Sequence, residues 1–161
     1  MVPSMTSFWL TLAATAATGL LAGASLDQSI KQLPARRRLG AQAYSLYSRA
    51  ADLRNGIPFY GLLGIGSAAL AIAAATVAHR ASLPFAVCFT LDLGATFAVL
   101  HSLVTVRAAP MLLSQRRFQD DARALAQLLD RFARWQAIRA GLQAVNFVIL
   151  LGGLVAVVEL R

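Results

Sequence analysis

Several polar side chains stand in segments that are otherwise strongly apolar, and they are the residues of this sequence best suited to chemistry. Asp92 and His101 fall in one apolar stretch, and Arg139, Gln143 and Asn146 fall in another. Polar groups are costly to place in a membrane, so they usually mark a functional site. A carboxylate or an imidazole can accept a proton, and a guanidinium can stabilise an anion.

The last apolar stretch carries its polar residues on one side. Arg139, Gln143 and Asn146 follow at i, i+4 and i+7, which places them on one helical face, and Trp135 precedes them by one turn. Such a stripe is expected to face a bundle interior or a water-filled pocket. Two alternatives stay open. Arg139 is near enough to the membrane boundary to snorkel or to pair with an acid or a headgroup, and Asn146 can bond to a neighbouring helix.

Further polar residues gather at the same end of the expected helices. Asp27 ends the first apolar stretch, and Asn55 and Tyr60 flank the start of the second. Together these residues predict a polar, substrate-binding pocket that opens toward the cytoplasmic leaflet. Asp92 and His101 are nine residues apart, on opposite sides of an ideal helix. They can share one narrow pocket only if the helix is kinked, so that question stays open.

Four membrane-spanning helices must position these residues. Apolar residues make up 58% of the 161-residue chain and charged residues 14%, against about 25% charged in soluble domains. Four stretches, near residues 8–26, 57–78, 83–106 and 137–158, are long enough to cross about 30 Å of hydrocarbon. The sequence therefore predicts an all-α fold, a four-transmembrane-helix bundle that forms one integral membrane domain over residues 1–161.

The first stretch has a rival interpretation as a signal peptide, because Ala22-Gly23-Ala24 resembles a cleavage site. A signal peptide begins with basic residues, and none precedes this stretch. An uncleaved span is therefore predicted.

The distribution of basic residues predicts the orientation. Six of the fifteen basic residues lie in the first loop and six in the third, while only Arg80 separates the second and third spans. By the positive-inside rule, both basic loops are cytoplasmic and both termini lie outside, as expected in a bacterial-type inner membrane. A net charge of +8 would suggest nucleic acid in a soluble protein, but the concentration of the basic residues in two loops fits contact with anionic lipid headgroups better, so nucleic acid is not expected as a partner.

Both basic loops contain apolar residues at helical spacing. Residues 37–53 and 118–132 are predicted to form amphipathic cytoplasmic helices, which lie on the membrane surface, extend the spans, cap a cavity or dock a partner. Asn55-Gly56 and Pro58 predict the end of the first of them. Glycines at positions 19, 23, 61, 64 and 66 predict close helix packing in a compact bundle, with a homo-oligomer contact as the alternative.

Recognisable cofactor motifs are absent from the sequence. It has no phosphate loop, no nucleotide fingerprint and no CxxC pair. Its two histidines, His79 and His101, fall toward opposite ends of the bundle and cannot sandwich one haem. Asp92 and Cys88 are too few ligands for a metal. No cofactor and no metal site are therefore predicted.

Two segments carry a resemblance to a family. Residues 23–38, "GASLDQSIKQLPARRR", place a polar break and a proline after the first span, and "DRFARWQAIRAGLQAVNF" leads Trp135 and Arg139 into the last. With the four-span layout, the chain resembles the anthrone-oxygenase-like membrane proteins. The resemblance implies oxidation of a lipophilic aromatic molecule by O₂ without a cofactor. Asp92 or His101 would then act as the base, Arg139 would stabilise the oxyanion, and Asn146 or Gln143 would orient the substrate.

Three functions follow as hypotheses. The first is an oxygenase-like oxidoreductase acting on an aromatic or quinone-like substrate. The second is a non-enzymatic protein that binds or transports a lipid or another small molecule, and the third is an accessory subunit of a membrane complex. A dry, closed pocket favours catalysis, a continuous polar path favours transport, and a tightly packed core favours the accessory role.

Overall fold

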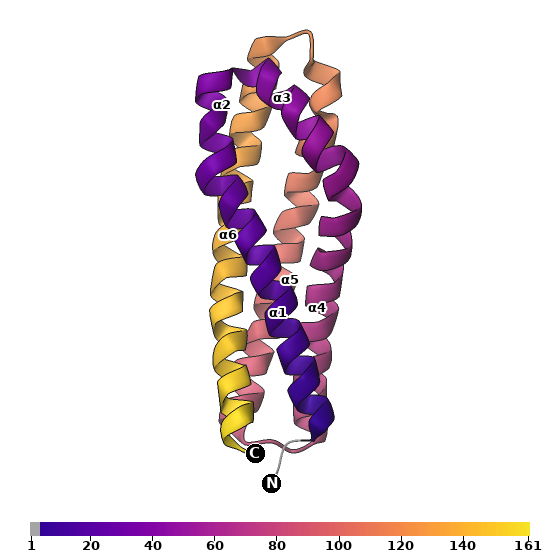
Figure 1. Ribbon diagram of the computed structural model, residues 1–161, viewed down its shortest axis with the longest axis vertical. Coiled ribbons are helices and arrows are strands. Elements are labelled where there is room, and N and C mark those ends of the chain that lie inside the picture. Colours follow the sequence, from indigo (N-terminus) through magenta and orange to yellow (C-terminus); the bar gives the residue numbers. More distant parts are fainter. Residues whose placement is uncertain (1–3) are drawn as a thin grey trace.

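Four long helices form the body of the protein. The computed structural model describes residues 4–161, apart from the side chain of Asn55. Helices α1 (Met5–Asp27), α4 (Ile57–Arg80), α5 (Phe85–Leu113) and α6 (Ala122–Glu159) run along one another (Figure 1). Each is long and apolar enough to cross a membrane, and the described residues contain no strand. The predicted all-α fold with four transmembrane helices is confirmed.

The bundle has two different ends. Both termini and the short turn between α4 and α5 lie at one end, which we call the terminal end (Figure 1). The connections 28–56 and 114–121 lie at the other, which we call the loop end. The two basic loops therefore share one end of the molecule, as the four-span layout requires.

Three of the helices extend well beyond the predicted spans, and α5 does so by ending at Leu113 instead of near residue 106. The first continues through a π-helical turn, η1 (Gln28–Gln32), into α2 (Leu33–Leu39). Helix α6 has 38 residues, which makes it about 57 Å long at 1.5 Å per residue. The predicted third-loop helix is therefore not a separate element, because it forms the first turns of α6.

The predicted first-loop helix is wrong at both of its ends. Gly40 interrupts it between α2 and α3 (Ala41–Ala50) with a φ of 82°, a conformation that glycine adopts readily. Nor does the chain leave its helix at residues 55–58, because a second π-helical turn, η2 (Ala51–Gly56), leads directly into α4. Pro58 is tolerated there because it lies in the first turn, where no N–H is needed.

The apolar faces of the loop-end helices behave differently from one another. Leu125, Leu129 and Phe132, in the first turns of α6, are buried inside the protein. In the first loop, by contrast, Leu39 and Leu46 are exposed. Contact of that stripe with the membrane surface stays a prediction.

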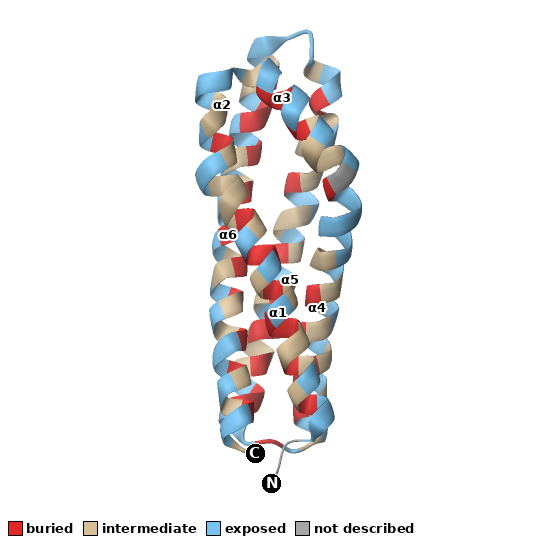
Figure 2. Cartoon of the chain, in the orientation of Figure 1, coloured by how far each residue is buried: buried red, intermediate tan, exposed pale blue. Residues whose placement is uncertain are grey.

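Two separate cores hold the bundle together (Figure 2). The core of the terminal half is built from small and aliphatic side chains of all four long helices, among them Ala14, Ala71, Leu91 and Leu150. The core of the loop end joins α2, α3, α5 and α6 through side chains that include Tyr44 and Leu129. Helix α4 takes part only in the first core, so its loop-end half has no hydrophobic core beside it.

Glycines allow close packing at some of the predicted positions. A Cβ added at Gly19 would lie 2.8 Å from the ring of Phe147, so this glycine does admit a close neighbour. At Gly23, Gly61, Gly64 and Gly66, an added Cβ would meet nothing within 4 Å. Within the bundle, the prediction of close packing is wrong at those four positions, and the alternative of a homo-oligomer contact stays a prediction.

Candidate functional site

A cavity of about 470 Å³ lies between the two cores, in the loop-end half of the bundle. Its lining residues come from α1, η1, η2, α4, α5 and α6, so it is enclosed by all four long helices. The volume falls within the range of about 300–1,000 Å³ that small-molecule sites occupy. Most of the lining surface is apolar, and it includes a smaller number of polar groups, which is the usual composition of a ligand pocket.

Four elements supply the main polar groups of the cavity. Helix α5 contributes His101, α6 contributes Arg139 and Gln143, and η2 contributes Asp52. Tyr60 adds a phenol from the first turn of α4. The structure thus gathers into one site four residues that the sequence pointed to, namely His101, Arg139, Gln143 and Tyr60.

His101 and Gln143 are the most buried of these polar residues. Their side chains are 1% and 2% exposed, and the Gln143 amide nitrogen lies 3.5 Å from Nδ1 of His101. Within the described part of the chain, Nε2 of His101 and Oε1 of Gln143 have no hydrogen-bond partner. The imidazole tautomer is therefore coupled to the orientation of the Gln143 amide, because Nδ1 accepts from one end of the amide and donates to the other.

Arg139 brings a cation to the same cavity. Its guanidinium makes no hydrogen bond or salt bridge with any residue that the structure describes, and its Nε atom is buried without a partner. A buried cation is costly to leave unpaired. The cavity therefore favours a ligand that brings an acceptor oxygen or a negative charge to Arg139.

Asp52 is the acid that faces this cation across the cavity. It accepts hydrogen bonds from the Ser48 hydroxyl at 2.7 Å and from the Gln28 amide at 3.4 Å. Burial raises the pKa of the Asp52 carboxyl, while the two hydrogen bonds and the charge of Arg139 oppose that shift. The Asp52 carboxyl therefore keeps its proton to a higher pH than an exposed aspartate does.

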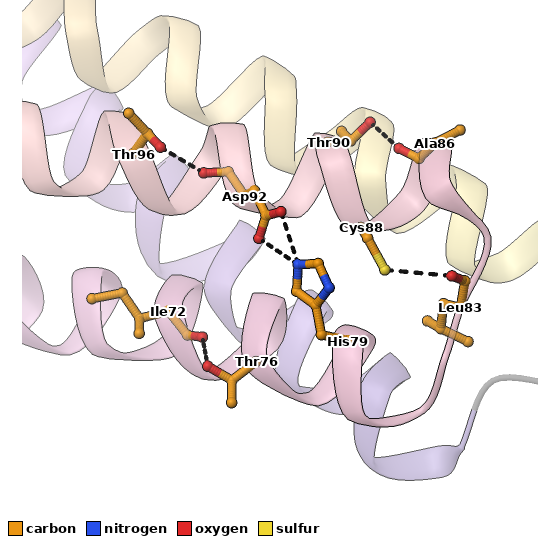
Figure 3. Close-up of polar contacts among 9 residues, drawn as sticks. All are labelled: Ile72, Thr76, His79, Leu83, Ala86, Cys88, Thr90, Asp92 and Thr96. Carbon is orange, nitrogen blue, oxygen red and sulfur yellow. Dashed lines mark hydrogen bonds and ion pairs between the residues drawn. The ribbon is translucent and has the colours of Figure 1, made fainter.

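Asp92 lies outside the cavity, on the terminal half of α5. Its carboxylate oxygens lie 2.8 and 3.0 Å from Nε2 of His79, which is the last residue but one of α4 (Figure 3). Both side chains are about half exposed. Asp92 and His101 do not share one pocket, so Asp92 is not placed to act as the base for a ligand in the cavity.

The remaining predicted residues are distributed around the site. Asn146 is fully buried but does not line the cavity, and both of its amide atoms lack a partner among the described residues. Trp135 packs against the loop-end core. Asp27 bonds with Lys31 and Gln32, at 2.5 and 2.6 Å, away from the cavity lining. The side chain of Asn55 lies outside the described residues.

Sequence reasoning did not single out Asp52, which falls within the amphipathic loop helix predicted over residues 37–53. The helix does not stop at residues 55–58, and its π-helical turn carries Asp52 to the cavity. A second missed feature is a line of buried hydroxyls on α1, at Ser7, Thr11, Thr15 and Thr18. Their spacing of three or four residues is visible in the sequence and marks one helical face. Thr15 also donates to the carbonyl of Leu150 on α6, at 3.2 Å.

Comparison of the chain with protein-family models, curated proteins and solved structures gives no match.

Proposed function

We propose that the protein is a membrane-embedded, cofactor-independent oxygenase-like enzyme acting on a lipophilic aromatic or quinone-like substrate. The observation that carries the proposal is that His101 and Arg139 line the same cavity. Removal of a weakly acidic proton requires a general base and a cation that both reach one substrate. The resemblance to the anthrone-oxygenase-like proteins agrees with this chemistry.

The proposed reaction converts a CH₂ group between aromatic rings into a carbonyl. Neutral His101 takes one proton from the carbon, and the charge that moves to the substrate oxygen is stabilised by Arg139. The electron-rich anion reduces O₂ and forms a C–O bond with it, and the resulting peroxide takes up a proton. Loss of water, together with the second C–H proton, leaves the carbonyl. One CH₂ group and one O₂ molecule thus give one C=O group and one H₂O molecule.

Gln143 acts in this scheme as a positioning residue. For Nε2 of His101 to accept the proton, Nδ1 must carry its own hydrogen and donate it to the Gln143 oxygen. In the structure, the Gln143 amide nitrogen lies 3.5 Å from Nδ1 of His101. The arrangement needed for catalysis therefore requires the Gln143 amide to turn so that its oxygen faces Nδ1. The orientation of Gln143 therefore decides whether His101 is a base or a donor.

A non-enzymatic binding protein is the second candidate. His101 lines the cavity but is only 1% exposed, so its ring presents little surface to a ligand. In a pure binding site, His101 and Gln143 would only complete the polar lining, while Arg139 would hold an acceptor group of the ligand.

The test is O₂ consumption with anthrone as substrate, measured on protein in lipid nanodiscs. His101→Gln and Arg139→Gln are each expected to lower turnover by about 10²-fold or more, the usual contribution of a base or an oxyanion partner. His79→Gln and Asp92→Asn are the matched controls, because that pair lies outside the cavity, and both should retain turnover. Anthrone that binds without consuming O₂ would assign the cavity to the second candidate.

A further inference from the structure

On the side of α4, the cavity has no packed core behind it. In the first ten residues of α4, 57–66, no described residue is buried, whereas Ser67, Ala71, Ala74, Ala75 and Ala78 in its second half are. Figure 2 shows the loop-end half of α4 in the colours of exposed and intermediate residues. Helix α4 is therefore anchored at the terminal end and stands free of the cores beside the cavity.

Two glycines thin α4 at the level of the cavity. Gly61 and Gly64 both line it, and an added Cβ at either position would meet nothing within 4 Å. Gly94 and Gly153, in contrast, each have a leucine side chain within 3 Å of the added carbon. The glycines of α4 thus leave space beside the helix instead of admitting a close neighbour.

The rim of this space is exposed and apolar. Ile57 and Ile65 on α4, and Val106 and Leu113 on α5, line the cavity and are also 46–76% exposed. On the opposite side, the lining residues Leu21 and Ser25 of α1 are buried. The cavity therefore opens between α4 and α5, through a gap that we call the window and define by these four rim residues.

We propose that the window is the entrance of the cavity, and that its ligand is a lipid-dissolved amphiphile that enters sideways from the bilayer. Ile57 and Ile65 belong to a helix apolar enough to span a membrane, so a rim of this composition faces acyl chains. The ligand then places an oxygen-bearing polar group against Arg139 and Gln143, and its apolar body toward the window. The proposal concerns access and ligand class, and it holds whether the occupant is oxidised or only bound.

The test measures how a reagent reaches a thiol inside the cavity. Ser102 lines the cavity, and its hydroxyl bonds only to the carbonyl of Ala98 in its own helix, so Ser102→Cys is a small change. In a Cys88→Ala background in liposomes, N-ethylmaleimide, which dissolves in lipid, should label this thiol. Adding Gly61→Leu or Gly64→Leu should slow labelling by about tenfold, as a barrier of about 1.4 kcal/mol does.

Gly66→Leu is the matched control, because Gly66 lies on the same helix, has equally open space and does not line the cavity. It should leave the labelling rate unchanged. The proposal is overturned if Ser102→Cys is not labelled by N-ethylmaleimide, or if the leucines on α4 leave its rate unchanged. Faster labelling by a membrane-impermeant cationic thiosulfonate would equally overturn it, in favour of an aqueous entrance. Because no substrate or O₂ is involved, the outcome is separate from that of the turnover assay.

Discussion

At the scale of single residues, the cavity contains buried polar side chains whose hydrogen bonds are only partly satisfied by the protein. Asp52 is held by Ser48 and Gln28, and it faces Arg139. His101, Gln143 and Arg139 each keep at least one buried polar atom without a partner among the described residues. Buried polar groups normally find partners, so a ligand or water that completes this set is expected.

Asp52 gives a prediction about pH and stability. Because its pKa is raised in the folded protein, the folded state binds more protons than the unfolded state between the two pKa values. The contribution of Asp52 to stability is therefore fully present below the ordinary aspartate pKa and is lost as pH rises through the raised one. Asp52→Asn should remove this loss, since the amide oxygen still accepts from Ser48, and the variant should be the more stable protein at neutral pH.

The measurement is the midpoint of thermal unfolding in detergent, followed from acidic to neutral pH. Asp120→Asn serves as the control, because Asp120 is exposed and far along the chain in the loop before α6. The same pH dependence of the midpoint in Asp52→Asn as in the wild-type protein would contradict the prediction.

At the scale of elements, the contact between α5 and α6 depends on glycines that have no room for a side chain. A Cβ at Gly94 would lie 2.6 Å from one methyl group of Leu150 and 3.1 Å from its branch carbon. Gly94→Ala should therefore destabilise the fold, by about 1–3 kcal/mol as overpacking does.

Gly152→Ala is the matched substitution, because Gly152 lies on α6 but is exposed, and an added Cβ there meets nothing within 4 Å. It should be neutral or stabilising by up to about 1 kcal/mol, through helix propensity. Unfolding of both variants in mixed micelles, titrated with a denaturing detergent, measures the two free energies. Equal effects at the two sites would show that space at Gly94 is not the limiting factor.

The helices themselves could be predicted from the sequence, because runs of about twenty apolar residues have few structural alternatives. Their continuation could not. Gly40 breaks the first-loop helix through a backbone conformation that the neighbouring residues do not predict. The π-helical turn η2 continues the helix at residues 55–58, where Gly56 and Pro58 indicate that it ends. The site depended on that continuation, since it moves Asp52 from a loop surface to the cavity.

Part of the site was nevertheless accessible from spacing alone. Arg139 and Gln143 are one turn apart on α6, and both line the cavity. Asp92 was misjudged because its partner, His79, lies on another helix, and pairing between helices is not encoded in the spacing along one of them.

At the scale of the whole molecule, the loop end and the terminal end carry different charge. The basic residues of the two connections, 28–56 and 114–121, all lie at the loop end. By the positive-inside rule, we expect that end to face the cytoplasm. In a Cys88→Ala background, a membrane-impermeant thiol reagent applied outside intact cells should label Ser82→Cys, in the turn between α4 and α5. It should not label Gln119→Cys until the membrane is opened. The reverse pattern would invert the proposed orientation.

Helix α6, at about 57 Å, is far longer than the roughly 30 Å of hydrocarbon it has to cross. The bundle therefore protrudes from the bilayer, and nothing in its length alone fixes how far. The window lies in the loop-end half, beyond the terminal core, so its depth varies with the thickness of the surrounding membrane. Long acyl chains would cover the rim, whereas short ones would leave it among headgroups. Lipid composition then becomes a control on which molecules reach the cavity, without any motion of the protein.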